Sequence, residues 1–538
     1  MPVLPLVLTL ALSVSLPQQH QHEHGAVPEA LGRVHFETSC DPATRAEFDR
    51  AVALLHSFWF TAAADAFTRV AERDPRCGIA WWGVAMSRWG NPFAPSRPPR
   101  ALEDGSAAIQ KARAAGAATE RERAYIDAAA ELFESFSSVP HRTRILNYER
   151  AMERLHARYP EDREGAAFYA LAVNQTALPT DKTFTQQLKA AAILEKLFEE
   201  QPDHPGAAHY LIHAYDHPPL APKALPAARR YAKIAPDAPH ALHMPSHTFT
   251  RVGLWEDSVA TNRASAEAAR RVNSIGDALH ALDYQAYAYL QMAQDGSASR
   301  VHEEVQEIVA RLEGGQQYTQ VGLFASTAIP ARLALERGAW TEAARLEPRA
   351  TPFPFIDAMT HYARALGAAR SGALSTLDGD VAKLGELHAA LVAKGEDYWA
   401  QQVRIQHIAA QAWAAYATRD RERALTLLRE AADLEGSLEK AAITPGPLAP
   451  ARELLGEMLL ELGRPADALR EFESVMESEP GRFRTTLGAA RAAARAGDSA
   501  AARQHYAQLL QIAPRPDGAP RPELQEARDA VQGATAGR

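Results

Sequence analysis

The sequence predicts an all-α protein built from repeated helical hairpins, an α-solenoid. Three observations support this prediction. The chain has 538 residues, more than one hydrophobic core usually serves, so we expect several domains or a repeat array. Alanine is abundant, while the alternating runs of β-branched residues that are typical of strands are scarce. The C-terminal part of the chain repeats itself with a period of 34 residues.

The repeat is clearest between the segments that begin at Glu461 and Ala494. A turn glycine, a small alanine, an aromatic residue and a closing proline recur in the same order. The matched pairs are Gly463 with Gly497, Ala468 with Ala502, Phe472 with Tyr506, and Pro480 with Pro514. A single hairpin cannot bury its own apolar face, so neighbouring units must stack and share one continuous core.

This pattern resembles the tetratricopeptide repeat (TPR), a helix–turn–helix unit. Looser copies of it follow Asp41 and occupy most of the chain. They contain Phe60, Ala63, Phe67 and Pro75; Gly253, Trp255 and Ser258; Gly338, Trp340 and Ala343; and Ala424 and Leu428. The resemblance implies a TPR-like helical-hairpin superhelix in which the first helix of each unit lines a concave groove. That groove is where we expect a peptide or protein partner to bind.

Several longer motifs resemble a group of exported bacterial TPR proteins. They are HFETSC (35–40), LLHSFWF (54–60), HPGAAHYLIHAYDHP (204–218), HMPSH (243–247) and LHALDYQAYAYLQ (279–291). The resemblance covers about residues 35–295. It implies secretion and a TPR fold, and it implies no particular reaction.

Proline-rich breaks at residues 94–100, 348–354 and 444–450 divide the helical part into blocks. The predicted organisation is a signal peptide (1–16), a His-rich flexible leader (17–34), a degenerate TPR array with a His-rich groove (35–347), helical hairpins (355–440), a C-terminal TPR pair (446–515), and a partly helical or disordered tail (516–538).

The apolar run from Val3 to Leu16 is too short to span a bilayer but suits a signal-peptide core. The small residues Ser13 and Ser15 can flank a cleavage site. We therefore expect a periplasmic or secreted protein with no membrane span; the alternative is a hydrophobic start of a cytosolic protein. The formal charge of −8, without a large basic block, argues against nucleic acid as a partner.

The chain has two cysteines, Cys40 and Cys77. In an oxidising compartment they can pair, and the chain-entropy treatment values such a loop closure at about 3–4 kcal/mol. Two buried free thiols are the alternative. The predicted export favours the disulfide.

Histidines are concentrated in one part of the chain, with seven of the 20 between His204 and His247. The pairs His209/His213 and His243/His247 are each spaced i,i+4 and lie 34 residues apart. In the TPR register both pairs occupy positions five and nine of a first helix, which face the groove. His204, before Pro205, is expected to begin a helix rather than to bind a ligand.

The same register adds further side chains to this surface. His240 occupies position two of the middle repeat, and the next repeat places His280 and Asp283 at positions two and five. The predicted metal ligands are His209, His213, His240, His243, His247, His280 and Asp283. Asp216 and the histidines that do not bind metal are expected to form hydrogen bonds to the ligand rings and so fix their orientation.

Imidazoles four residues apart lie on one helix face, about 6 Å apart along the axis, and adjacent helices pack about 8–10 Å apart. Both pairs can therefore converge on a divalent transition metal. Nitrogen ligands suit Zn, Cu, Ni or Fe, and Asp283 can complete the site. The number of candidate ligands leaves room for two ions. Polar or satisfied core histidines are the alternative, and Pro245 could disturb the helical spacing.

Catalysis remains open at this point. The HExxH pattern of zinc proteases fails, because Tyr210 stands where the general-base glutamate would be. A base would have to come from Asp216, Asp283 or Glu256, or from a metal-bound hydroxide. We therefore predict a metal-binding protein in which catalysis is undecided. The alternative is a metal-free scaffold that binds a peptide or envelope protein.

Two other groups of residues receive simpler interpretations. His20, His22 and His24, in the motif QHQHEHG, could capture copper or zinc loosely, but a flexible polar leader is the favoured interpretation. The tryptophans near the start are predicted to be core rather than a ligand platform. They are Trp59, Trp81, Trp82 and Trp89.

Overall fold

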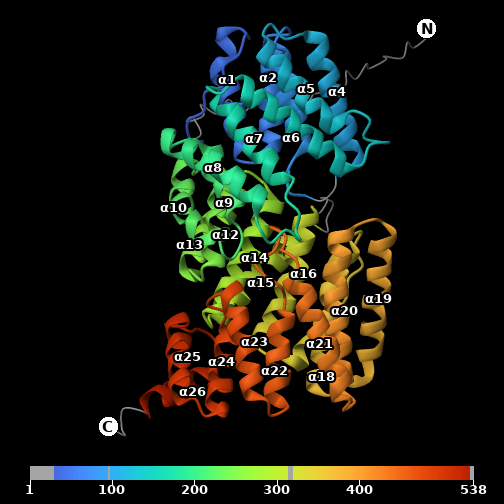
Figure 1. Ribbon diagram of the computed structural model, residues 1–538, viewed down its shortest axis with the longest axis vertical. Helices are drawn as coiled ribbons and strands as arrows, with labels where there is room; N and C mark the ends of the chain where they lie inside the picture. The colour runs from blue at the N-terminus through green and yellow to red at the C-terminus, as the bar shows by residue number, and fades with distance from the viewer. Residues whose placement is uncertain (1–29, 95–96, 313–318, 534–538) are drawn as a thin grey trace, which may run out of the picture.

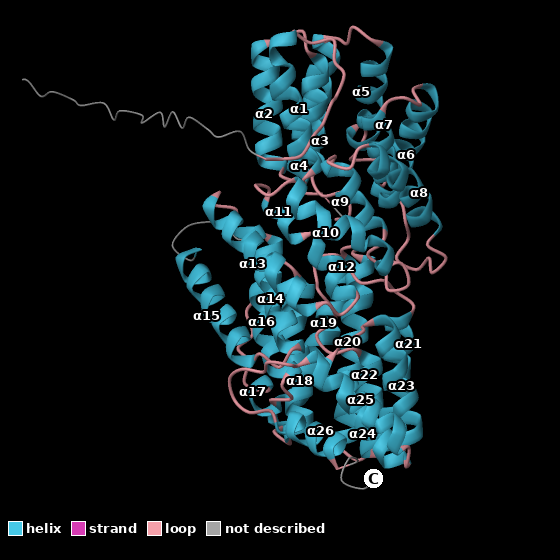
Figure 2. Cartoon of the chain, turned by 90° about the vertical axis from the view of Figure 1, so that its left-hand side faces the viewer, coloured by secondary structure: helices cyan, strands magenta, loops and turns pink. Residues whose placement is uncertain are grey.

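The computed structural model describes residues 30–94, 97–312 and 319–533. Helices joined by short loops make up this part of the chain (Figure 2), and its strand-type pairing is one isolated bridge between Gln294 and Asp517. The predicted all-α, TPR-like solenoid is confirmed. The predicted signal peptide (1–16) and the leader histidines His20, His22 and His24 lie outside the described residues.

The N-terminal block lies at one end of the long axis (Figure 1). It follows the short 3-10 helix η1 (Pro42–Thr44). Its helices are α1 (Arg45–His56), α2 (Phe60–Arg73), α3 (Gly78–Trp89), α4 (Pro99–Ala115), α5 (Glu120–Phe133), α6 (His141–Arg158), α7 (Arg163–Gln175) and α8 (Thr185–Glu200). Trp82 and Trp89 are buried in its core, and Trp59 and Trp81 pack against it half-buried. Their predicted structural role is confirmed.

The central block carries the histidine-rich segment. Its elements are α9 (Pro205–Ala214), η2 (Ala221–Ala224), α10 (Leu225–Ile234), α11 (Pro239–His243), α12 (Pro245–Arg251), α13 (Trp255–Arg271), α14 (Ile275–Gln291), α15 (Asp295–Leu312) and α16 (Gln320–Glu336). His204 is the N-cap of α9, and its Nδ1 accepts the Ala207 N–H at 3.1 Å. This confirms it as the residue that begins the helix, since an N-cap acceptor satisfies an otherwise unpaired N–H.

The remaining helices form the C-terminal half. They are α17 (Trp340–Ala343), α18 (Pro354–Ser371), η3 (Leu374–Thr376), α19 (Leu377–Ala393), α20 (Asp397–Ala417), α21 (Arg421–Gly436), α22 (Ala451–Glu461), α23 (Pro465–Ser478), α24 (Phe483–Ala496), α25 (Ser499–Ile512) and α26 (Pro522–Gln532). Gly463 and Gly497 have φ of 73° and 85°. The turn after each first helix therefore has a left-handed backbone conformation, which glycine adopts easily because it has no Cβ. The predicted tail is helical over α26.

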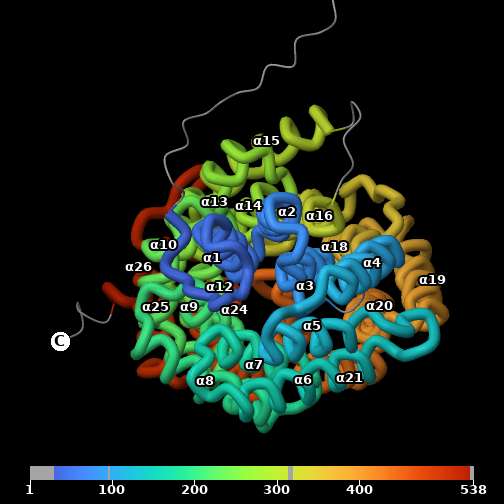
Figure 3. The backbone as a smooth tube through the Cα atoms, turned by 90° about the horizontal axis from the view of Figure 1, so that it is seen from above, coloured from blue at the N-terminus to red at the C-terminus, as the bar shows by residue number. Residues whose placement is uncertain are grey.

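Seen from above, the helices wind around a common axis, with α9–α13 on one side and α18–α21 on the other (Figure 3). The C-terminal hairpins return to the central block. Trp255 Nε1 donates to the Gly481 carbonyl at 2.9 Å, and the buried Arg482 guanidinium donates to Tyr287 Oη at 2.8 Å. None of the helices in the described part of the chain combines the length and apolar character that a membrane crossing requires.

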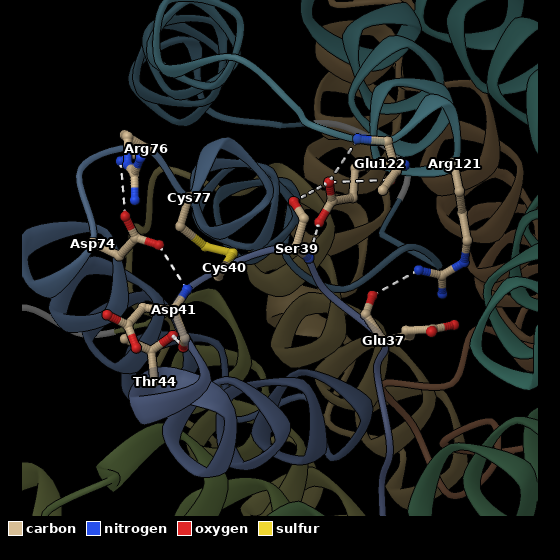
Figure 4. The surroundings of a disulfide bond; sticks show 11 residues. Glu37, Ser39, Cys40, Asp41, Thr44, Asp74, Arg76, Cys77, Arg121 and Glu122 are labelled. Carbon is tan, nitrogen blue, oxygen red and sulfur yellow. Dashed lines mark hydrogen bonds between the residues drawn. A yellow bond between two sulfur atoms is a disulfide. The ribbon is translucent and has the colours of Figure 1, made fainter.

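Cys40 and Cys77 form a disulfide that joins the segment before α1 to the start of α3 (Figure 4). The Asp41 N–H donates to the Asp74 carboxylate at 2.8 Å beside it. The prediction of a disulfide rather than free thiols is confirmed. The end of the predicted leader needs correction, because residues 30–34 are already held in place. The Arg33 N–H, for example, donates to the Asp203 carbonyl at 2.9 Å.

Candidate metal centre

Three neighbouring stretches of helix bring the histidines together: α9, the α11–α12 segment, and α14. Pro245 does not disturb the spacing. Met244, between α11 and α12, keeps helical angles (φ −53°, ψ −36°), and its N–H donates to the His240 carbonyl at 2.9 Å. Proline is tolerated at this position because it is the first residue of α12. His243 and His247 therefore keep their i,i+4 relationship.

The rings gather in two groups. The first triad is His209, His213 and His240, and the second triad is His243, His247 and His280. Within each triad, one ring nitrogen of every member lies within 4.8 Å of one nitrogen of the other two. We expected the two i,i+4 pairs to converge on each other. Instead, each pair takes its third ring from position two of the following repeat, because that position faces the preceding helix.

The two triads are adjacent. The ring centroids of His213 and His247 are 5.9 Å apart, and those of His240 and His243 are 6.0 Å apart. All six residues are buried except His240 and His280, which are half-buried and form the more open edge of the cluster.

Aromatic rings that the repeat pattern did not indicate enclose both triads. The Phe58 ring lies 4.3 Å from the ring of His209 and stacks on that of His240 at 5.4 Å between centroids. Its backbone has a φ of 52°, an uncommon conformation for this residue type and one that recurs at functional sites. Tyr284 packs edge-on against His243 at 4.7 Å.

In the first triad the Nε2 atoms lack partners. The Nδ1 of His209 contacts the His56 carbonyl at 2.6 Å and must donate to it, which leaves the Nε2 of a neutral ring with only a lone pair. The Nε2 atoms of His209, His213 and His240 are all buried, with no hydrogen-bond partner among the described residues. Buried polar atoms without protein partners are rare, and binding of an ion is one of the recognised ways in which they are satisfied.

The second triad brings two such nitrogens into contact. The Nε2 atoms of His243 and His247 are 3.0 Å apart. The Nδ1 of His243 donates to Asn262 Oδ1 at 2.7 Å, and the Nδ1 of His247 donates to Asp216 Oδ2 at 2.9 Å. Asn262 is oriented by its own amide, whose Nδ2 donates to the Ser258 carbonyl at 2.7 Å. Two neutral rings in this arrangement point lone pairs at each other.

The electrostatics keep these rings neutral. Burial, reinforced by the neighbouring imidazoles, holds the pKa of five of them well below the usual value for histidine: His209, His213, His240, His243 and His280. Burial also lowers the pKa of His247, although Asp216 opposes the shift. A neutral imidazole is the form that binds a metal ion.

Asp283 does not belong to this cluster, which corrects the prediction. Its Oδ1 accepts from Arg332 Nε at 2.8 Å, and both side chains are buried. The same guanidinium donates to Thr444 Oγ1 at 2.8 Å. At 3.6 residues per turn, Asp283 is turned by about 60° from His280 around the axis of α14, and its carboxylate meets α16 instead. A buried arginine needs this charge partner, and the carboxylate is therefore not available to the histidines.

Asp216 does take the supporting position expected of it. Besides His247 it accepts from Arg251 Nε at 2.9 Å, and Lys440 Nζ lies 3.8 Å from it. The two cations hold its pKa well below the usual range, so it stays ionised. Arg251 and Lys440 also line a cavity of about 850 Å³, together with Arg332, Tyr398, Trp399 and Glu479.

Another histidine cluster, which the sequence patterns did not indicate, has a different character. Glu164 accepts from His56 Nε2 at 2.7 Å and from His204 Nε2 at 3.0 Å, while His56 Nδ1 contacts Tyr210 Oη at 2.8 Å. Every ring nitrogen of this cluster has a hydrogen-bond partner, because His204 Nδ1 caps α9. It is a satisfied structural network. No spacing pattern could have indicated it, since its members come from three separate segments.

The comparisons with known proteins concern the repeat architecture. Residues 459–519 match the family model for the tetratricopeptide repeat. Solved structures with similarity include a monomeric mutant of IFIT1 with m7Gppp-AAAA (12% identity, 81% of this chain and 90% of that chain, TM-score 0.37). Another is the human IFIT1 dimer with m7Gppp-AAAA (10% identity, 88% and 96%, TM-score 0.36). No curated protein matches this chain.

Proposed function

We propose that this chain is an exported TPR-type protein that binds transition metal through the histidines of its two triads. The observation that carries the proposal is the 3.0 Å contact between the Nε2 atoms of His243 and His247, whose Nδ1 atoms are both engaged elsewhere. A cation between the rings turns a repulsive contact into a pair of coordinate bonds. The unpartnered Nε2 atoms of the first triad support the same conclusion.

The direct test is metal analysis of the purified protein. We expect stoichiometric copper, zinc or iron in the wild type and its loss in the His209→Ala/His243→Ala double variant. His35→Ala is the matched control, because that side chain is 65% exposed and outside both triads. Wild-type protein that stays metal-free at micromolar supply of each ion would overturn the proposal.

The neighbouring cavity supports a catalytic use of the metal. Arg251 lines the cavity and binds Asp216, which in turn holds His247, so two side chains connect a molecule in the cavity to the second triad. The half-buried His240 and His280 are the most exposed members of the triads, so a further ligand would approach the metal from their side. We propose a metal-dependent hydrolase or oxygenase, tested by comparing turnover by metal-loaded and chelated protein over ester, peptide and phenol substrates.

A metal-free scaffold is the second candidate, and the same cavity favours it. Its volume of about 850 Å³ and its lining of aromatic and oppositely charged side chains suit a peptide segment of a protein partner. Under this alternative the histidines form hydrogen bonds to the partner. Peptide binding that is unchanged by chelator but weakened by the His209→Ala/His243→Ala exchange would favour the scaffold. The formal charge of −8 does not suit a nucleic-acid partner.

We propose a periplasmic or secreted location. The disulfide between Cys40 and Cys77 supports it, because disulfides persist mainly in oxidising compartments. The mass of the protein recovered from the periplasm or medium tests this proposal. We expect it to correspond to a chain cleaved near Leu16, whereas uncleaved protein in the cytosol would contradict it.

A further inference from the structure

The geometry points to two copper ions, one in each triad, held side by side by three imidazoles each. This inference rests on the proposed function and specifies it, since it names the number of ions, their ligands and the element. It depends on the separation of the rings into two groups, on the charge around them, and on the all-imidazole composition of both triads.

Six ring nitrogens are more than one ion of the four-coordinate type accepts. The two triads are separate groups within the described residues, each compact to within 4.8 Å between ligand atoms. Three protein ligands and an open position are the usual arrangement of a reactive metal, whereas closed structural sites take four. Each triad therefore matches one ion with one position left for an exogenous ligand.

The two ions must be neighbours, because helix geometry ties the triads together. His240 and His243 lie about one turn apart, and each belongs to a different triad. Their centroids are 6.0 Å apart, and the centroids of His213 and His247, across the α9–α12 contact, are 5.9 Å apart. An exogenous ligand bound at one triad is consequently within reach of the other.

Outer hydrogen bonds orient three of the six rings, one in the first triad and two in the second. The acceptors are the His56 carbonyl for His209, Asn262 for His243 and Asp216 for His247. Metal-ligating histidines almost always donate their other N–H to such an acceptor. By contrast, the His56–Glu164–His204 network leaves no ring nitrogen available.

The charge balance selects the element. In the described part of the chain neither triad includes a carboxylate. The nearest one identified, Asp216, is already balanced by Arg251 at 2.9 Å and Lys440 at 3.8 Å. Two divalent ions would bring four positive charges into this buried, neutral donor set, at a large desolvation cost. Two copper ions in the monovalent state bring only two.

The donor set agrees with this choice. Paired iron sites in helical proteins are built from glutamates and histidines, and mononuclear iron sites use two histidines and a carboxylate. Zinc accepts three histidines, but two zinc ions carry the four charges counted above, and in the divalent state copper also stands above zinc in the order of affinities. An all-imidazole pair of sites therefore favours copper over both competitors.

Copper loading of the full chain tests the inference. Apoprotein is loaded with Cu(I) without oxygen, in competition with equimolar Zn(II), and desalted. We expect two copper atoms per chain, one in His213→Gln, one in His280→Gln, and none in the double variant, with two retained in the His35→Ala control. Circular dichroism confirms that each variant is folded.

Spin counting after oxidation adds a readout that does not depend on any variant. Two neighbouring Cu(II) ions couple, so the wild type should show far fewer spins than copper atoms, while each single variant should show about one spin per copper. One copper per chain, preferential retention of zinc, or full spin counts in the wild type would overturn the copper pair while leaving metal binding intact. Protein that takes up no metal would overturn the proposed function itself.

Discussion

His243 and His247 face each other with their Nε2 atoms 3.0 Å apart, although both rings donate their Nδ1–H to other acceptors and so carry no hydrogen on Nε2. Only a cation or an added proton makes this contact favourable. Because metal binds the folded state, its removal should lower stability. We expect chelation to reduce the free energy of unfolding by about 3 kcal/mol or more at a metal concentration 100-fold above Kd, measured by denaturant unfolding. An unchanged midpoint would contradict this.

Asp216 should matter for metal affinity rather than for the number of ions. Asp216→Asn removes the charge that orients His247 and balances Arg251. Loss of such an outer partner typically weakens metal binding about 10–100-fold. Competition with a chelator of known affinity measures the change. The control is Asp257→Asn on the exposed face of α13. Equal affinities for the two variants would show that Asp216 does not support the site.

The disulfide should contribute stability without affecting the metal. Cys40 and Cys77 are 37 residues apart, a loop whose closure the chain-entropy treatment values at about 4 kcal/mol. The Cys40→Ser/Cys77→Ser exchange is therefore expected to lower the unfolding free energy of the N-terminal block by this order. Metal content should stay at the wild-type value. A loss of metal in folded protein would mean that this block controls the site.

Arg482 should be a strong determinant of the contact between the C-terminal hairpins and the central block. Its side chain is fully buried and pairs with Glu453 at 3.0 Å and Glu336 at 2.9 Å. Removing it leaves two buried carboxylates without this counter-charge. Arg482→Ala should cost about 3–5 kcal/mol by denaturant unfolding. Arg503→Ala, on the exposed face of α25, should cost little; similar losses in both would contradict the assignment.

Glu435 should make stability depend on pH. Burial raises its pKa to about 7, although the Ala451 N–H donates to its carboxylate at 2.7 Å. The folded state therefore favours the protonated form, and stability falls as pH rises from about 4.5 through 7. Glu435→Gln should be more stable than wild type by about 1–2 kcal/mol at pH 8 and equal to it near pH 4.5. No difference at pH 8 would contradict the shift.

Part of the site could be predicted because it follows the repeat. The period of 34 residues places His209 and His243 at equivalent positions, and the i,i+4 spacing adds His213 and His247 on the same faces. The repeat register also predicted His240, at position two, as a member of the site. The structure brings all of these rings into the two triads.

The rest of the site depends on contacts between repeat units, which the spacing of residues within one unit does not specify. Asp283 fits the register, but its charge is taken by Arg332, which comes from α16. Phe58 reaches the first triad from a loop and has left-handed backbone geometry. Asn262 binds His243 from α13, the second helix of its repeat, whereas the predicted groove positions all lie on first helices. Such partners follow from three-dimensional packing between units rather than from spacing within one unit.

Anomalous diffraction from crystals of copper-loaded protein, recorded on both sides of the copper absorption edge, tests the central claim most directly. The account predicts two anomalous peaks, one among His209, His213 and His240 and the other among His243, His247 and His280. A map with no peak among these rings, or with a single peak shared by both triads, would contradict it.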